Sequence, residues 1–322
     1  MTAERRRRLL VELLPVFLLV ALFAVFAAVE SRIADPANLR NVVLQATPIA
    51  VLALGAFVVL VSGGIDLSTG FSVALVAVVV GNALVADRPL VWAAGLGLLV
   101  AASIGLANGV LVGVLRLPAF IATLGTMTVV QGLTLFVATS GLLVIDDPVL
   151  NALGRRELAG IPVPVLLVVA IGGLMWVLMR QTRFGLRTYA IGSDAEKAVL
   201  SGVSPVRQQV LLYLLSGIFV WATALLLIGR IGLVQTNIGG VSLLLDAIAA
   251  AVIGGTSIFG GRGTVGGVLV GALIISLLTN ALQVLGVDPS AINLYKGVII
   301  IGALIADAVL RRVYTRTLRS AG

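Results

Sequence analysis

Long apolar runs recur along almost the whole of this sequence, and they limit what the chain can fold into. Several runs approach the roughly 20 residues that a helix needs to cross the hydrocarbon core of a bilayer. The runs do not alternate between polar and apolar residues, as the strands of a transmembrane β-barrel do. A soluble domain is excluded too, because only 11% of the residues are charged, where about a quarter is usual. The sequence therefore predicts an all-α polytopic membrane protein.

Ten spans can be placed on these runs. We expect them to make residues 1–322 a single transmembrane domain, with a short basic segment at 1–8 and a basic tail at 311–322. The run that follows the four arginines at 5–8 is long enough to span, so we interpret it as a first span and not as a cleaved signal. The predicted spans cover residues 9–29, 42–62, 68–86, 89–115, 118–139, 162–180, 210–228, 243–257, 264–285 and 293–310.

The distribution of basic residues predicts the orientation of these spans. Cytoplasmic loops carry an excess of Lys and Arg. If both termini lie in the cytoplasm, fifteen of the 22 Lys and Arg residues fall on that side. The sequence therefore predicts an N-in, C-in arrangement, with the long loop at 140–161 outside and the longer loop at 181–209 inside.

The chain has no Cys and no His. Disulfides, thiolate metal sites and a His-based catalytic triad are thereby excluded, and we expect no catalytic residue and no metal site. The net charge of +8 is explained by the cytoplasmic loops, so nucleic acid is not an expected partner.

A polar break, VSGGIDLSTG at Val61–Gly70, separates the second and third predicted spans. Backbone that leaves a helix at membrane depth must be covered by protein or water, and Gly63 and Gly64 permit such a break. Asp66 precedes a new apolar run, where a carboxylate caps free N–H groups. An ionisable group in a membrane segment also commonly faces a cavity. Both interpretations of Asp66, as an N-cap and as part of a translocation path, remain open here.

Other polar side chains interrupt the spans and could line the same path. For each one, hydrogen bonding between helices is the simpler explanation. The candidates for the translocation path are Asp66, Ser68, Asn108, Thr126, Gln131, Asp246 and Asn280.

Two glycine patterns indicate close packing. Small residues recur every fourth position from Gly97 to Gly113 and from Gly263 to Gly271, which lets a second backbone approach; this can serve packing within the chain or a dimer seam. Residues 253–267 hold seven glycines but lack the G-x-x-x-x-G-K-[ST] phosphate loop. We interpret this segment as a compact cytoplasmic turn.

The cytoplasmic loop contains a short amphipathic helix. Ser193 and Glu196 have the spacing of a capping box, and Gly202 stands where a C-terminal glycine belongs. Because such a short helix is not stable alone, it must dock on its own chain, on the membrane surface or on a partner protein. The residues predicted to form it are Ser193, Asp194, Glu196, Ala198, Leu200 and Gly202.

Three stretches, SGGIDLSTG, YAIGSDAEKAVLSGV and LLLDAIAAAVIGGTSIFGGRGTVGG, together resemble the permease subunits of bacterial ABC importers of the ribose/simple-sugar type. The likeness runs in order from about residue 40 to about residue 310. Asp194-Ala195-Glu196-Lys197-Ala198 departs from the Pro-Glu-Ala-Ala that relatives often carry, which puts partner-specific contacts in doubt. Branched-chain amino acid permeases share the architecture but usually lack the Gly-Gly-Ile-Asp-Leu-Ser run.

The resemblance implies the ABC-importer permease fold in the bacterial inner membrane and uptake of a monosaccharide or related polyol. It implies a homodimer or heterodimer of permeases, cytoplasmic ABC ATPase subunits that bind ATP and Mg²⁺, and a periplasmic or lipid-anchored solute-binding protein. No cofactor is then bound by this chain, and the helix near Asp194 couples it to the ATPase. The alternatives are a branched-chain amino acid permease, an ion-coupled secondary transporter that uses Asp66 or Asp246 as a relay, and a scaffold without transport.

Overall fold

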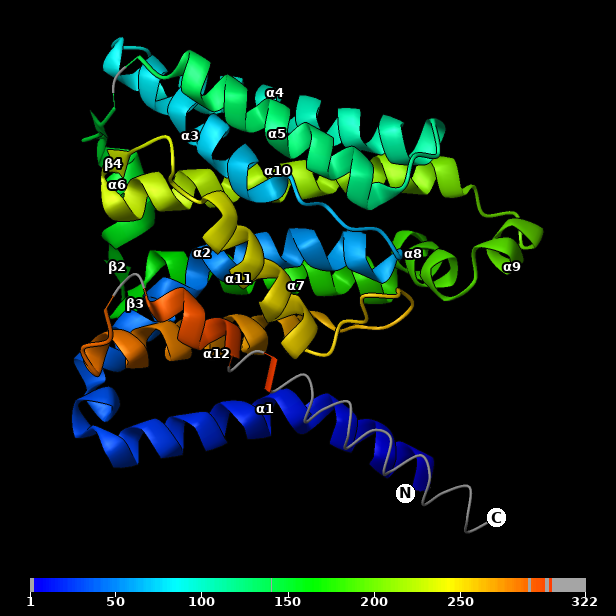
Figure 1. The fold of residues 1–322 in the computed structure, drawn as a ribbon, viewed down its shortest axis with the longest axis horizontal. Helices are drawn as coiled ribbons and strands as arrows, with labels where there is room; N and C mark the ends of the chain where they lie inside the picture. Colours follow the sequence, from blue (N-terminus) through cyan, green and yellow to red (C-terminus); the bar gives the residue numbers. More distant parts are fainter. Residues whose placement is uncertain (1–2, 140, 289–290, 299–300, 303–322) are drawn as a thin grey trace.

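The structure is a computed structural model that describes residues 3–139, 141–288, 291–298 and 301–302, without the side chains of residues 3–12. Most of its helices lie side by side and run between two opposite ends of the molecule (Figure 1). The helices are α1 (Ala3–Val29), η1 (Ser31–Ala34), α2 (Pro36–Val61), α3 (Thr69–Val85), α4 (Leu90–Gly109), η2 (Val110–Val114), α5 (Ala119–Val137), α6 (Pro148–Arg155), α7 (Val163–Gln181), α8 (Arg183–Ser193), α9 (Ala195–Leu200), α10 (Pro205–Ile231), α11 (Gly240–Ile253) and α12 (Val265–Val284).

Six of the described helices are long and apolar enough to cross a membrane: α2, α4 with η2, α5, α7, α10 and α12. Three shorter apolar helices, Leu13–Val29 within α1, α3 and α11, accompany them. These nine helices coincide with the first nine predicted spans. Residues 291–298 and 301–302 are helical, but most of the tenth predicted span and the basic tail at 311–322 lie outside the described residues.

The structure adds two details to the predicted fold. Helix α1 begins at Ala3, so it includes the arginines at 5–8 as well as the first predicted span. The fold is mostly helical, as predicted, and the described residues also contain short strands. Four two-residue strands pair as two antiparallel ribbons, β1 (Leu143–Val144) with β4 (Leu233–Val234) and β2 (Glu157–Leu158) with β3 (Ile161–Pro162).

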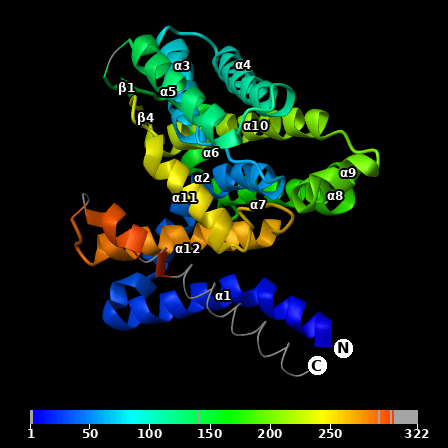
Figure 2. The same cartoon turned by 45° about the vertical axis from the view of Figure 1, so that its right-hand side comes forward.

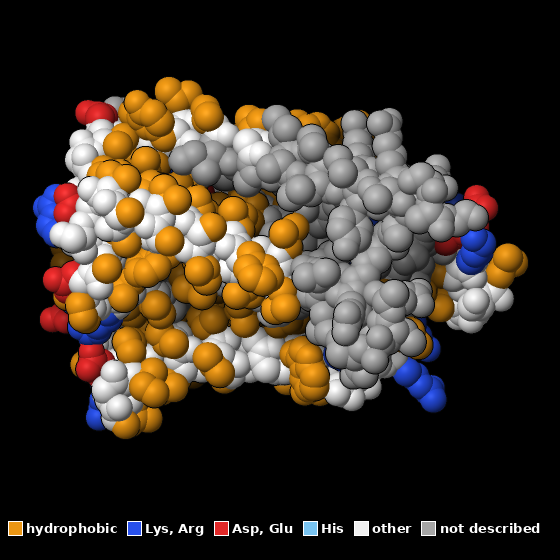
Figure 3. All heavy atoms as spheres, turned by 90° about the horizontal axis from the view of Figure 1, so that it is seen from below, with side chains coloured by type: hydrophobic (Ala, Val, Ile, Leu, Met, Phe, Trp, Pro, Cys, Tyr) orange, Lys and Arg blue, Asp and Glu red, His pale blue; other side chains and the backbone are white. Residues whose placement is uncertain are grey.

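Helices α2 and α10 form the centre of the molecule. Every residue of α2 from Ala46 to Val61 is buried, and Leu212 and Tyr213 of α10 are fully enclosed. By contrast, α4, α5 and α7 expose large apolar side chains such as Val91, Phe136 and Leu174. Apolar surface of this extent is typical of contact with lipid. Figure 3 shows apolar side chains across the described part of one face and charged side chains at its two ends.

The two ends of the molecule carry different elements. The beginning of α1 lies at the same end as α8 and α9, whereas α6 and the four strands lie at the opposite end (Figure 1). We call these the α9 end and the strand end. The predicted outer loop, 140–161, and the predicted inner loop, 181–209, therefore lie at opposite ends, as the ten-span arrangement requires.

The stripe of small residues on α4 packs within the chain. A Cβ at Gly105 would meet the carbonyl oxygen of Tyr213 at 2.5 Å, and one at Gly109 would meet Cα of Val210 at 2.8 Å. Both contacts are with α10. Helix α1 lies along α12 at the edge of the bundle (Figure 2), where its residues Leu22 and Phe26 pack near Leu277.

Candidate functional site

The break between α2 and α3 is a non-helical segment held at Asp66. Gly63 turns the chain with a φ of +84°, and α3 begins only at Thr69, with Ser68 in the N-cap position. Asp66 therefore does not occupy the N-cap. Its Oδ1 instead accepts hydrogen bonds from the backbone N–H of Ser68 at 3.0 Å and from the hydroxyl of Ser68 at 2.6 Å.

Side chains from three neighbouring helices complete the polar cluster around this segment. The Asn108 amide of α4 donates to Ser68 Oγ at 2.9 Å and, over 3.3 Å, to Asp66 Oδ1. From α10, the hydroxyl of Ser216 lies 3.4 Å from Asp66 Oδ2 and that of Tyr213 donates to Ile65 O at 3.0 Å. The hydroxyl of Thr123 on α5 donates to the same Ile65 carbonyl oxygen at 3.3 Å. This enclosed network satisfies backbone and side-chain groups that would otherwise be unpaired in an apolar interior.

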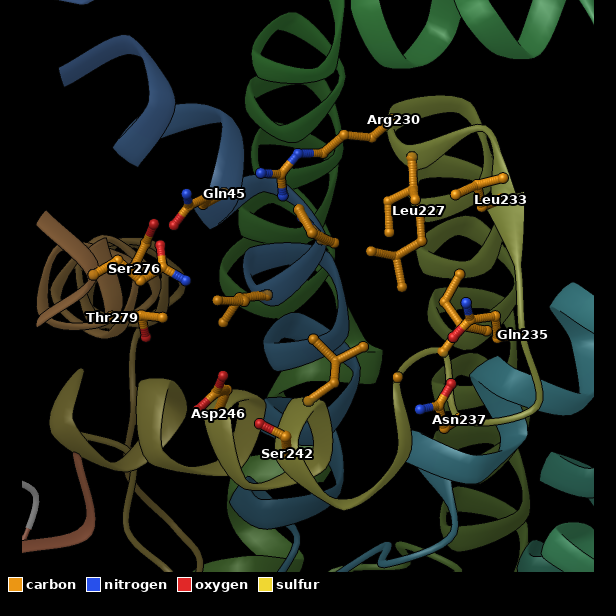
Figure 4. A pocket seen from close by; sticks show the side chains of 17 residues that line it. Gln45, Leu227, Arg230, Leu233, Gln235, Asn237, Ser242, Asp246, Ser276 and Thr279 are labelled. Atoms are coloured by element: carbon orange, nitrogen blue, oxygen red, sulfur yellow. The ribbon is translucent and has the colours of Figure 1, made fainter. Parts of the chain in front are cut away.

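A cavity of about 500 Å³ lies between α2, α10, α11, α12 and the segment that joins β4 to α11. Side chains from all of these elements converge on it (Figure 4). Of the seven predicted path residues, only Asp246 lines this cavity. Its polar lining residues are Gln45, Arg230, Gln235, Asn237, Ser242, Asp246, Ser276, Thr279 and Gln283.

Asp246 is paired with a cation. Lys296 Nζ lies 2.7 Å from its Oδ1 and 2.9 Å from its Oδ2, and both residues are buried. The pair joins α11 to the helical residues 291–298. The carboxylate at the cavity wall is thus compensated by a lysine that the cavity lining does not include.

The other predicted path residues lie elsewhere. Asn280 accepts a hydrogen bond from Asn38 at 2.9 Å, which joins α12 to α2. Thr126 donates to Ala122 O one turn earlier in its own helix, and Gln131 is exposed on α5. The structure brings Asp66, Ser68 and Asn108 together, and it does not bring these three residues to Thr126, Gln131, Asp246 or Asn280.

The predicted short helix exists as α9, but its N-cap is Asp194 and not Ser193. Ser193 is the last residue of α8, and Asp194 Oδ1 accepts from Lys197 N at 3.1 Å. The ammonium group of Lys197, 2.8 Å from Asp194 Oδ2, holds the pKa of this carboxyl below its usual range. Glu196 therefore has no capping-box partner at Ser193.

The C-terminus of α9 matches the prediction. Gly202 has a φ of +77°, its N–H donates to Val199 O, and Val203 N–H donates to Ala198 O; this is a Schellman motif. Ala198 is buried against the chain, but Leu200 is 88% exposed. The helix therefore docks on its own protein through one side and leaves an apolar side free.

The three stretches that carry the resemblance meet at one place, which we call the glycine junction: Gly63, Gly192, Gly260 and Gly261. Gly261 N–H donates to Val61 O at 2.8 Å. A Cβ at Gly192 would overlap Val61 O, and one at Gly260 would meet Gly63 N at 2.9 Å. Only residues without a side chain allow the end of α2, the end of α8 and the loop before α12 to approach this closely.

Comparison with known proteins places the chain in a family. The family model described as branched-chain amino acid transport system / permease component matches residues 38–306. The chain belongs to this permease family. It is 38% identical over 281 residues to the ribose import permease protein of Bacillus subtilis, covering 85% of each chain.

Two further relatives of the permease have similar coverage. The ribose import permease protein of Haemophilus influenzae is 33% identical, over 94% of this chain and 95% of the relative. The galactose/methyl galactoside import permease protein of Escherichia coli is 35% identical, over 90% and 92%. No solved structure matches the chain. The family and the six apolar helices make the chain a multi-pass inner-membrane permease.

Sequence reasoning missed most of the permease's cavity. Gln45 and Gln283 interrupt apolar runs, and Arg230 falls in a predicted outer loop, so each carries a polar signal. The sequence does not indicate which helix ends face one another. The convergence of α2, α10 and α12 on one cavity was therefore not predictable.

Proposed function

We propose that this chain is the membrane-spanning subunit of an ATP-driven importer of a monosaccharide or a related polyol. The observation that carries the proposal is its identity of 33–38%, over most of its length, with import permeases for ribose and galactose. Although the family description names branched-chain amino acids, these relatives favour a sugar. Transport of branched-chain amino acids receives no support from them.

In this proposal, residues 1–322 form one transmembrane domain with ten spans and both termini in the cytoplasm. The α9 end then faces the cytoplasm and the strand end faces outward. This orientation agrees with the excess of Lys and Arg expected on the cytoplasmic side and with the opposite placement of the two long loops (Figure 1).

The partner at the α9 end is a cytoplasmic ATPase. The sequence has no phosphate-binding loop of the G-x-x-x-x-G-K-[ST] type, so ATP and Mg²⁺ are bound by another chain. Helix α9 presents Val199 and Leu200 to that partner, since both side chains are exposed. A second permease subunit and a solute-binding protein on the outer side complete the assembly.

The glycine junction supplies a route from the ATPase to the transmembrane helices. Movement of α9 is passed to α8, with which it shares Asp194 as a cap. From Gly192 of α8, contacts lead to Val61 at the end of α2 and to Gly261 before α12. Helices α2 and α12 both line the cavity. Displacement at α9 would therefore alter the shape of the cavity.

Uptake into proteoliposomes tests this function. The permease is reconstituted with its ATPase and binding protein, and uptake of labelled ribose and galactose is followed with ATP, without ATP, or with only an ion gradient. We expect uptake that requires both ATP and the ATPase. Uptake by the permease alone, driven by a proton or sodium gradient, would identify a secondary transporter and refute the proposal.

A further inference from the structure

Five side chains of the cavity share an unusual property. Among the residues that the structure describes, none of them makes a side-chain hydrogen bond or ion pair with the protein. They come from α2, α10, α12 and the segment between β4 and α11, so the cavity gathers free hydrogen-bonding groups from separate parts of the chain. The five are Gln45, Arg230, Gln235, Asn237 and Gln283.

The charge of the cavity wall is distinctive. The carboxylate of Asp246 is compensated by Lys296 at 2.7 Å, and Arg230 is the other charged residue of the lining. The uncompensated charge is therefore the guanidinium of Arg230, which extends into the space toward Gln45 (Figure 4). A cationic solute is repelled by this group, whereas oxygen acceptors are attracted to it.

Much of the remaining lining is apolar. Ile49 of α2, Leu227 of α10 and Leu233 of β4 supply hydrocarbon surface between the polar groups. Ligand sites for small molecules commonly combine apolar walls with a few placed polar groups and have volumes of roughly 300–1,000 Å³. The cavity, at about 500 Å³, has room for one monosaccharide with some water.

We propose that this cavity is the binding site of the solute within the membrane, and that its ligand is a neutral polyhydroxylated ring. Arg230 donates to two adjacent hydroxyl oxygens through its planar fork of N–H groups. The amides of Gln45, Gln235, Asn237 and Gln283 both donate and accept, as hydroxyl groups require. The assignment rests on the proposed import of a sugar and adds the site that holds it.

The location of the cavity is suitable for a solute-binding site. Its lining includes β4 and the last turn of α10, which lie at the strand end (Figure 1). In the proposed orientation this end faces the protein that delivers the solute. A solute released there enters the cavity before any movement at the α9 end.

A matched pair of arginine variants tests the site in the full reconstituted complex. Arg230→Gln keeps a polar side chain but removes the charged fork, and Arg88→Gln makes the same change at an exposed arginine between α3 and α4. Loss of a hydrogen bond to a charged group corresponds to about tenfold or more in affinity. We expect Arg230→Gln to raise the KM for sugar uptake by about tenfold or more and Arg88→Gln to leave it unchanged.

The outcomes separate the site from the function. If the wild-type complex imports a neutral sugar with ATP and Arg230→Gln does so with the same KM, the site assignment is wrong and the proposed function stands. If the wild-type complex imports only sugar acids, the proposal that the ligand is neutral is wrong. If it imports no sugar, the proposed function itself fails. Should Arg230→Gln not assemble, Asn237→Ala replaces it, with the same expected rise in KM and the same contradicting result.

Discussion

Asp66 shows how far a single residue could be understood before the fold was known. The break at Gly63 and Gly64 and the need for a polar anchor followed from the sequence. The partners did not, because Asn108 lies 42 residues and Ser216 lies 150 residues further along the chain. In the structure, Asp66 is a buried acceptor for Ser68 and its neighbours and does not line the cavity, so we interpret the motif as architectural.

The substitution of Asp66 separates architecture from transport chemistry. Asp66→Asn retains one acceptor oxygen for Ser68, so we expect it to preserve most of the stability and the uptake. Asp66→Leu leaves several buried donors without an acceptor, each at a cost of about 1–3 kcal/mol. Thermal unfolding of the purified variants and their uptake in proteoliposomes measure both effects. A folded Asp66→Asn variant without uptake would show that the charge itself is required.

The buried pair of Asp246 and Lys296 predicts an asymmetric result. Lys296→Met leaves a buried carboxylate uncompensated, and removing one partner of such a pair destabilises by about 3–5 kcal/mol. Asp246→Asn combined with Lys296→Met removes both charges, so we expect the double variant to recover much of the lost stability. Unfolding midpoints of the two variants provide the comparison. Equal unfolding midpoints for Lys296→Met and the double variant would mean that the charges of Asp246 and Lys296 do not stabilise each other.

At the scale of elements, the apolar helices and the short helix α9 were predictable, whereas α8 was not. Nine apolar helices followed from the length of their apolar runs, which tertiary context rarely overrides in a membrane. Helix α8 was missed because its stability comes from packing: a Cβ at Gly185 or Gly192 would overlap backbone of α7 or α2. Because α8 continues through Ser193, the cap of α9 lies one residue later than the capping-box spacing indicated.

The termini of α9 predict its behaviour as a docking element. Asp194→Ala removes the N-cap, with a loss of about 1 kcal/mol, and also the ion pair with Lys197. Gly202→Pro is incompatible with a φ of +77° and removes the hydrogen bond to Val199. We expect both variants to insert normally but to bind the ATPase more weakly, as measured by co-purification.

Asp194→Asn is the matched control for these variants, since asparagine caps a helix about as well as aspartate does. We expect it to retain ATPase association. If Gly202→Pro also assembles and transports normally, α9 is not the element that couples the permease to the ATPase.

At the scale of the whole molecule, the decisive feature is the convergence of distant stretches. Gly63, Gly192 and Gly261 were each visible in the sequence, but nothing in a single sequence indicates that they touch. The cavity has the same origin, because its polar residues lie at the ends of separate helices. Sequence patterns predicted the elements well, whereas the contacts between elements required the three-dimensional structure.

Gly192→Ala tests the glycine junction as a mechanical link. Its Cβ would overlap Val61 O and lie 2.6 Å from Gly261 N, so α8 must move away from α2. Because α9 itself is unaltered, we expect normal association with the ATPase but strongly reduced uptake per ATP hydrolysed. Gly173→Ala is a suitable control, since a Cβ there meets nothing within 4 Å. Unchanged coupling in Gly192→Ala would exclude the junction as the route.

If α9 couples the permease to its ATPase, nucleotide binding at the α9 end changes the cavity near the strand end. The chain has no cysteine, so the near-isosteric variant Ser242→Cys places a single thiol in the cavity wall. Its rate of labelling by a membrane-impermeant maleimide can be measured in the reconstituted complex with and without ATP. We expect labelling rates that differ severalfold between the two conditions. Identical rates in a complex that hydrolyses ATP and imports sugar would contradict it.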